Sequence, residues 1–320
     1  MRLLIVTQAV DQDDPVLGFF HRWLEEFAKH AEAVEVVCLY EGRHALPKNV
    51  RVHSLGKEQG ARPALVYALR FLSLIGKLRA SYDAVFVHMN AEYVLLGAPL
   101  WKLWRKRVAL WYLHGTVSAR LRFAVALADV ILTSSPESMR VATKKKRIVG
   151  HGVDTETFRP DPGVSRGTHL LSLGRLMPRK RHELAIAAAA LLERPLRIVG
   201  EGPERASLEA LAKRSGADVS FLGGLSHGAV VKEYQEAAWV LHTSATGSMD
   251  KVVLEALAAG AEVVTTSQVY KGFPLAVVEA TPEAIAAAVK KGTTHPERAA
   301  YVREHYALAT LIPRILATIS

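Results

Sequence analysis

HLLSLGRLMPRKRHELAIAAAALLERPLRIVG, residues 169–200, is the stretch that decides the fold. An apolar run ends in a glycine and a basic loop, an alanine-rich helical stretch follows, and a second apolar run, LRIVG, closes the unit. Strands of continuous apolar character that alternate with helices are typical of a parallel sheet covered on both faces. This stretch therefore predicts a βαβ unit of an α/β domain.

The same alternation extends over most of the chain. Apolar runs predict strands at 2–8, 34–40, 83–89, 108–114, 128–134 and 147–153, and again at 169–174, 196–200, 219–223, 239–244 and 262–267. The segment 159–168, RPDPGVSRGT, is rich in proline and glycine and is predicted as a linker. We therefore predict an α/β fold of two doubly wound, Rossmann-like parallel-sheet domains, residues 1–158 and 169–300. Ligands of such sheets bind at the carboxyl ends of the strands, which here would surround a central cleft. A C-terminal helix, 301–320, would pack back toward the first domain.

The amino-acid composition excludes several classes of protein. Hydrophobic residues make up 50% of the 320 residues and charged residues 22%, which excludes a disordered or fibrous chain. The single cysteine, Cys38 in VEVVCLY, excludes an internal disulfide framework and predicts a buried strand thiol in a reducing, cytoplasmic setting. No apolar run reaches the roughly 18 residues of a membrane span, and MRLLIVTQ is too short for a secretory signal.

Positive charge is concentrated in the first half of the chain. The net charge is +10, and residues 1–150 hold 22 Lys and Arg against 13 Asp and Glu. Such a bias favours an anionic partner: nucleic acid, a membrane surface or an acidic small molecule. The segment 99–111 is typical of a helix on an anionic membrane surface, although a helix packed through its tryptophans fits equally. Its aromatic and basic residues are Trp101, Lys102, Trp104, Arg105, Lys106 and Arg107.

Glycine-containing turns follow four strands of the second half. In SLGRLMPRKRHE, Gly174 permits a tight turn, and Arg175 and Lys180 are two cations suited to a diphosphate. IVGEGPER and FLGGLSH carry further turns, and the fourth is TGSMDKVVLEALAAG, 246–260. Its sparse turn leaves backbone N–H groups at a helix start, which suits an anion. The dinucleotide fingerprint is absent after the first strand, which argues against a hydride-transfer enzyme.

These motifs, in this order, resemble the nucleotide-sugar domain of retaining glycosyltransferases of the GT-B fold. The group is family 4, glycosyl transferases group 1. HGVDTETFRP, 151–160, resembles the family's interdomain junction, and WYLHGTVS, 111–118, resembles its acceptor-domain histidine segment. The resemblance covers nearly the whole chain and implies transfer of a hexose-type sugar from a UDP- or GDP-linked donor. It implies a lipid-linked or glycan acceptor, no cofactor and no metal.

The resemblance also implies roles for particular residues. Arg175 and Lys180 would bind the donor diphosphate, Glu255 the ribose, and His114 the transferred sugar. Asp250 would approach the sugar, because the glutamate that many members carry eight positions before the residue matching Glu255 is here Gly247. The remaining donor contacts would come from Gly18, Gly174, Gly202, Leu225, Ser248, Met249, Lys251 and Val252.

The sequence is also compatible with other functions. A nucleotide-sugar hydrolase or epimerase would have the same fold, and a basic nucleic-acid-binding protein would explain the charge, although no binding module is recognised. Asp11-Gln12-Asp13 matches the acid-any-acid pattern of metal-dependent transferases, but its acids also suit helix capping. The thirteen histidines show no metal-cluster spacing, and His88 is predicted as a core residue.

Overall fold

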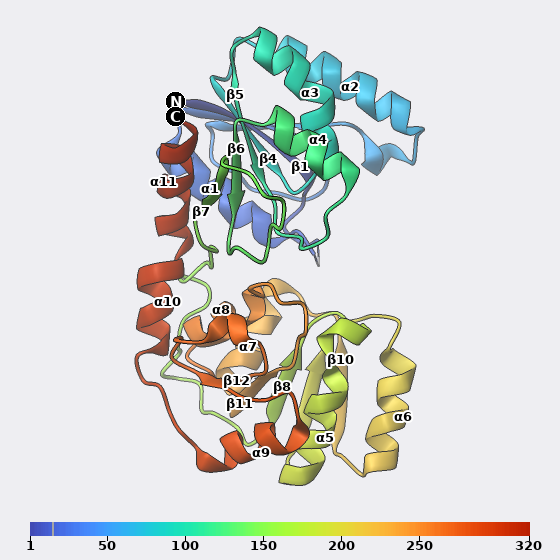
Figure 1. The fold of residues 1–320 in the computed structure, drawn as a ribbon, viewed down its shortest axis with the longest axis vertical. Helices are drawn as coiled ribbons and strands as arrows, with labels where there is room; N and C mark the ends of the chain where they lie inside the picture. Colours follow the sequence, from blue (N-terminus) through green and yellow to red (C-terminus); the bar gives the residue numbers. More distant parts are fainter. Residues whose placement is uncertain (15) are drawn as a thin grey trace. The chain divides into compact units, whose positions relative to one another are not determined.

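The structure is a computed structural model, and it describes residues 1–14 and 16–320. It divides the chain into two compact units. Unit 1 comprises Met1–Gly152 and Leu308–Ser320, and unit 2 comprises Val153–Ala307. Each unit has one sheet, and every strand pair in both sheets is parallel (Figure 1). The predicted class, two Rossmann-like α/β domains with parallel sheets, is confirmed.

The sheet of unit 1 has the order β3-β2-β1-β4-β5-β6-β7 within the described residues. The order reverses between β1 and β4, as in a doubly wound fold. The elements of unit 1 are β1 Arg2–Val10, α1 Phe19–His30, β2 Ala33–Glu41, β3 Val50–Ser54, η1 Lys57–Gln59, α2 Ala64–Lys77, β4 Ala84–His88, α3 Ala91–Leu103, β5 Arg107–Trp111, α4 Ala119–Leu127, β6 Val130–Thr133, β7 Lys146–Ile148 and α11 Leu308–Ile319.

Helices cover both faces of this sheet. Along β1, Leu3 and Ile5 join the core under α1 and α11, whereas Leu4 and Val6 join the core under α2, α3 and α4. Successive side chains of a strand point to opposite faces, so a strand buried on both faces is apolar throughout. Cys38 of β2 is fully buried, and burial raises the pKa of its thiol to about 12. The prediction of a buried strand thiol is confirmed.

The sheet of unit 2 has the order β10-β9-β8-β11-β12-β13 within the described residues, and its order reverses between β8 and β11. One face lies under α7, α8 and α10 and the other under α5, α6 and α9. The elements are β8 Leu170–Leu173, η2 Pro178–Lys180, α5 His182–Leu192, β9 Leu196–Val199, α6 Arg205–Ser215, β10 Val219–Gly223, α7 His227–Glu236, β11 Trp239–His242, α8 Lys251–Ala258, β12 Glu262–Thr265, η3 Gln268–Tyr270, β13 Ala276–Val277, α9 Pro282–Lys291 and α10 Arg298–Tyr306.

The stretch that the sequence predicts as a linker, 159–168, lies inside unit 2. Phe158, just before it, is buried in the core of unit 2, and the Arg166 guanidinium donates to the carbonyls of Ala237, at 2.9 Å, and Gly260. These contacts fix the segment to the unit, and the chain changes units earlier, after Gly152.

The last predicted helix is two helices in the structure. Ala307 has extended backbone between α10 and α11 and forms a parallel bridge with Val153, whose N–H donates to the Tyr306 carbonyl at 2.8 Å. This pairing interrupts the helix, a break that apolar periodicity alone does not reveal. α11 packs on the sheet of unit 1, so the end of the chain belongs to the core of that unit. Six of its apolar side chains are buried there: Leu308, Leu311, Ile312, Ile315, Leu316 and Ile319.

Candidate functional site

Two loops of unit 2 meet where the strand order reverses. The loop 174–181 follows β8 and the loop 243–250 follows β11, and β8 and β11 are neighbours in the sheet. Lys180, from the first loop, forms an ion pair with Asp250, from the second, at 2.7 Å between Nζ and Oδ2. A crevice at the carboxyl ends of such strands is where open α/β sheets bind ligands.

Asp250 has a second polar partner, His242 at the end of β11. His242 Nε2 lies 2.9 Å from Asp250 Oδ2, and its Nδ1 lies 2.8 Å from the Thr265 hydroxyl. Burial would raise the pKa of the Asp250 carboxyl, but the hydrogen bond from His242 and the charge of Lys180 outweigh it and hold the pKa far below its usual range. Asp250 is therefore a carboxylate, bound between an imidazole and an ammonium.

Backbone contacts hold the two loops together. The Thr243 hydroxyl donates to the Lys180 carbonyl at 2.9 Å, and the Ala245 N–H donates to the Arg179 carbonyl at 2.9 Å. Tyr270, fully buried, donates its hydroxyl to the Asp250 carbonyl at 2.7 Å. These bonds fix the geometry of the Lys180–Asp250 pair before any ligand arrives.

Glycines allow the first loop to pack closely on its neighbours. A Cβ on Gly200 would lie 1.9 Å from the Gly174 carbonyl oxygen, and one on Gly202 would lie 2.2 Å from the Leu176 carbonyl oxygen. Gly202 thus supports the shape of the loop that carries Arg175 and Lys180. Gly174 has φ +146, a conformation that favours glycine.

The turn before α8 presents unpaired backbone donors. The N–H groups of Ser248, Met249 and Asp250 donate to no group in the described chain, and the Asp250 side chain does not cap the helix. Gly247 has φ +66, a left-handed backbone conformation that favours glycine. The helix start is therefore available to an oxygen-rich ligand.

Glu255 lies on the second turn of α8 and is 6% exposed. Its Oε1 lies 3.3 Å from Lys251 Nζ, and its Oε2 accepts a 3.5 Å hydrogen bond from the buried Tyr234 hydroxyl. Burial lowers the pKa of the Lys251 ammonium, and the charge of Glu255 opposes that shift. The side chains of Leu225, Met249 and Val252 pack at the edge of the same core.

Arg175 and His182 complete the loop after β8. The Arg175 side chain is exposed and has no hydrogen bond or ion pair in the part of the chain that the structure describes. His182, which the sequence reasoning missed, is 3% exposed; its Nδ1 lies 2.9 Å from the Ser172 hydroxyl and its Nε2 has no partner among the described residues. Burial lowers the pKa of His182 to about 4, so this histidine is neutral. His242 was missed as well, because WVLHTS reads as an ordinary strand.

The remaining predicted site residues belong to unit 1. His114 follows β5, is exposed, and meets the Tyr112 ring edge-on at 5.8 Å. Gly18 precedes α1, and a Cβ there would lie 2.6 Å from the Asp14 carbonyl oxygen, so glycine permits the tight loop. His88 is buried, with its ring stacked on Phe20 at 4.1 Å, as a core histidine is expected to be.

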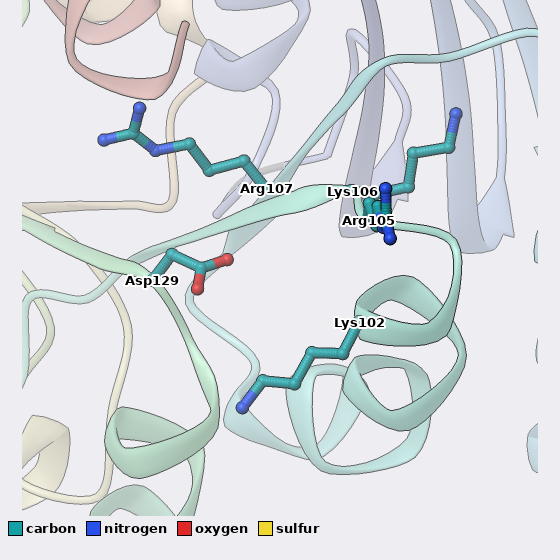
Figure 2. A pocket seen from close by; sticks show the side chains of 5 residues that line it. All are labelled: Lys102, Arg105, Lys106, Arg107 and Asp129. Atoms are coloured by element: carbon teal, nitrogen blue, oxygen red, sulfur yellow. The ribbon is translucent and has the colours of Figure 1, made fainter.

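A basic pocket of about 460 Å³ lies at the end of α3 and the start of β5 (Figure 2). Trp101 does not contribute to this surface: it is fully buried, and its indole N–H donates to the Tyr82 hydroxyl at 3.1 Å. The prediction of a membrane contact through Trp101 is therefore wrong, because the indole packs inward. The pocket is lined by Lys102, Arg105, Lys106, Arg107 and Asp129.

Among residues 1–14 and 16–320, no group of three His, Cys, Asp or Glu side chains has the arrangement of a metal site. Asp13, in the acid-any-acid segment, pairs with Arg43 at 2.7 Å. In the same described residues, no helix has the length and apolar character needed to cross a membrane.

Comparison with known proteins finds a family match for the second half of the chain. Residues 154–303, almost all of unit 2, match the family Glycosyl transferases group 1. No curated protein matches the sequence.

Solved structures match the chain over its whole length. The Anabaena Alr3699/HepE protein in complex with UDP has a TM-score of 0.77 at 18% identity and covers 100% of this chain and 99% of its own. The same protein in complex with UDP-glucose has a TM-score of 0.75 at 17% identity, with the same coverage. Sucrose-phosphate synthase from Thermosynechococcus elongatus has a TM-score of 0.72 at 17% identity and covers 100% of this chain and 95% of its own. The chain thus has the GT-B glycosyltransferase fold, and residues 154–303 match the family Glycosyl transferases group 1.

Proposed function

We propose that this protein is a retaining, metal-independent hexosyltransferase. It moves a hexose-type sugar from a UDP- or GDP-linked donor to a lipid-linked or glycan acceptor. The observation that carries the proposal is the pair of loops in unit 2 at the reversal of strand order. These loops carry Lys180, the unpaired Arg175 and three free backbone N–H groups. The Anabaena relative, solved with UDP and with UDP-glucose, supports a UDP-linked donor.

Unit 2 binds the donor. Arg175 and Lys180 hold the diphosphate, the N–H groups of Ser248 and Met249 bind sugar hydroxyls and phosphate oxygens, and Glu255 accepts from the ribose diol. Backbone groups near Gly202 and Leu225 line the nucleotide base. Because Lys180 is already paired with Asp250, the diphosphate shares its ammonium with that carboxylate. Asp250 then lies beside the sugar, in place of the glutamate that the family resemblance would put at Gly247.

The chemistry is a same-face substitution at the anomeric carbon. The bond from that carbon to the diphosphate oxygen breaks, the bond to the acceptor hydroxyl oxygen forms on the same face, and the hydroxyl proton passes to the departing phosphate. A double-inversion route would need a free carboxylate nucleophile, whereas Asp250 is bound to Lys180 and His242. Arg175 and Lys180 stabilise the charge that develops on the leaving diphosphate, which is the role of a metal in other transferases.

Unit 1 supplies the acceptor side. His114 contacts the transferred sugar, and Gly18 lets its loop approach donor and acceptor. The cations of the basic pocket, with the exposed Leu103 and the half-buried Trp104, contact an anionic membrane surface that holds a lipid-linked acceptor. The single buried cysteine suits a cytoplasmic location at the inner face of that membrane.

Thermal-shift screening tests the proposal with UDP, GDP, ADP, UDP-glucose, UDP-galactose and GDP-mannose. A ligand that binds only the folded state raises its apparent stability by mass action. We expect one diphosphate series to raise the melting temperature of wild type and to have a much smaller effect on Lys180→Gln. If no nucleotide or nucleotide sugar shifts the wild-type transition, the proposal is wrong. Nucleotide release at full rate without any acceptor would instead show a hydrolase.

A further inference from the structure

A groove of about 630 Å³ runs along α4 in unit 1. It lies between that helix and the segment 140–145, and it extends from Val117, before the first residue of α4, to Ala126, near its last. At 1.5 Å per residue, the helix gives the groove a length of about 13 Å. Apolar and cationic side chains line it together, among them Val117, Arg122, Val125, Arg140, Val141 and Lys145.

One end of the groove lies next to His114. The Arg140 guanidinium lies near Gly115: a Cβ built on that glycine would lie 3.3 Å from Arg140 Nε. His114 immediately precedes Gly115, and both follow the carboxyl end of β5. A molecule in the groove would therefore reach the edge of the sheet at which His114 is proposed to contact the transferred sugar.

The cationic side chains of the groove differ in whether other groups of the chain already bind them. The Lys145 ammonium is bound by the carbonyls of Val125, Ala126 and Ala128 at 2.7–3.2 Å, so it caps the end of α4. Arg122 and Arg140 are exposed and have no ion pair in the described chain, and no acidic residue lines the groove. Arg120, in contrast, has Glu92 at 3.6 Å.

We propose that this groove binds the acceptor, and that the acceptor is an amphiphile with a phosphate or carboxylate group near its reacting hydroxyl. The assignment of the groove to the acceptor rests on the proposed function. Two guanidinium groups without partners bind such an anion through paired N–H donors, which an ammonium cannot do. Val117, Val125 and Val141 contact the apolar part.

The basic pocket in Figure 2 fits this ligand less well. Its Lys106 ammonium is bound by the Tyr82 carbonyl at 2.5 Å, and the Arg107 guanidinium by the Ser320 carbonyl at 2.5 Å. No apolar side chain lines it, and it lies at the amino end of β5, whereas His114 follows the carboxyl end. Of these two cavities, the groove along α4 is the one that joins free guanidinium groups to an apolar lining beside that histidine.

The test is calorimetric titration of the full chain with dodecyl phosphate, below its micellar concentration. Dodecyl maltoside, with a neutral headgroup, and inorganic phosphate, with no apolar part, are the comparison ligands. We expect dodecyl phosphate to bind most tightly, roughly tenfold more weakly to Arg122→Gln or Arg140→Gln, and more weakly still to the double variant. Arg120→Gln, on the same helix with the same loss of charge, should bind like wild type.

Three results would overturn the proposal: equal binding of dodecyl maltoside, equal binding of inorganic phosphate, or full affinity in the double variant. UDP titration of the same samples separates this proposal from the function of unit 2. UDP should bind the double variant as it binds wild type, because Arg122 and Arg140 belong to unit 1. If UDP fails to bind wild type while dodecyl phosphate behaves as expected, the donor proposal fails and the anionic groove remains.

Discussion

Lys180 is the residue on which the donor site depends most. Its ammonium is already held in place by Asp250, from the neighbouring loop after β11, at 2.7 Å. Preorganised donors aimed at developing charge stabilise a transition state without reorganisation, and removal of one such donor costs on the order of 100-fold in turnover.

Lys180→Gln should therefore lower kcat by about 100-fold with a folded chain, as measured by nucleotide release in the presence of acceptor. Lys213→Gln removes the same charge from an exposed position on α6 and should leave kcat unchanged. Equal turnover of the two variants would show that Lys180 does not stabilise the leaving diphosphate.

The stability that Asp250 contributes to unit 2 depends on pH. Its pKa in the folded chain is far below its usual range, so its carboxylate stabilises unit 2 at every pH above the unfolded pKa of about 3.9. That stability is lost as the pH falls from there toward the folded pKa. Breaking a mostly buried ion pair from one side costs about 3 kcal/mol.

Asp250→Asn should thus lower the free energy of unfolding of unit 2 by about 3 kcal/mol at pH 7 and pH 5, and by less at pH 3. Urea unfolding followed by hydrogen exchange of unit 2 peptides measures this difference. Asp218→Asn, at an exposed position, is the control. A deficit that stays constant down to pH 3 would mean that the Asp250 charge is not the source of the stability.

At the scale of elements, the shape of the diphosphate loop depends on contact between backbones. Gly200→Ala would place a Cβ 1.9 Å from the Gly174 carbonyl oxygen, and neither backbone can move without breaking the bond from the Gly174 N–H to the Val199 carbonyl. We expect this variant to lose UDP binding by tenfold or more, because small misplacements of positioning groups are costly.

Gly228→Ala is the matched control, since nothing lies within 4 Å of the added methyl group and alanine favours the α7 helix. It should bind UDP like wild type in the same titration. If Gly200→Ala also binds UDP like wild type, close packing of the loop on β9 does not set the donor site.

The sequence predicts the strands of this fold well, because a strand buried on both faces is mostly apolar, as in residues 3–6 of β1. It predicts loops and helix ends less well. The break at Ala307 comes from pairing with Val153, 154 positions away, and the Trp101 side chain packs in the core beside Tyr82, to whose hydroxyl its indole N–H donates. Such partners are set by tertiary structure and leave no local pattern.

In the candidate site, too, single residues can be predicted from the sequence, whereas the contacts between them cannot. Arg175 and Lys180 are predicted because a glycine turn and charges at a strand end are visible in the sequence, whereas the role of Asp250 follows from the family resemblance. That Lys180 and Asp250 pair with each other is not visible, because they are 70 positions apart. The sequence does not single out His242 and His182 for a related reason. Each is one polar residue at the edge of an apolar run, and its role becomes visible only from the residues that surround it in the folded chain.

On the scale of the whole molecule, the chain ends in the unit in which it began. Burial of Ile315 makes α11 part of the core of unit 1, while α10, just before it, belongs to unit 2. Each unit therefore has its own core and is expected to unfold as a separate cooperative transition.

Ile315→Ala should lower the free energy of unfolding of unit 1 by about 3 kcal/mol, the usual cost of removing a buried isoleucine side chain, and leave unit 2 unchanged. Hydrogen exchange during urea unfolding resolves the two units. Ala317→Ser, exposed on the same helix, should change neither. Equal destabilisation of both units would show that they unfold as one.

The central claim is that unit 2 holds a nucleotide through its diphosphate, at the carboxyl ends of β8 and β11. Titration calorimetry of the full chain with UDP, GDP and the phosphate-free nucleosides uridine and guanosine tests it most directly. We predict that one nucleoside diphosphate binds at least 100-fold more tightly than its nucleoside, and that Lys180→Gln removes most of that difference. Equal affinity for diphosphate and nucleoside, or an undiminished difference in Lys180→Gln, would contradict the account.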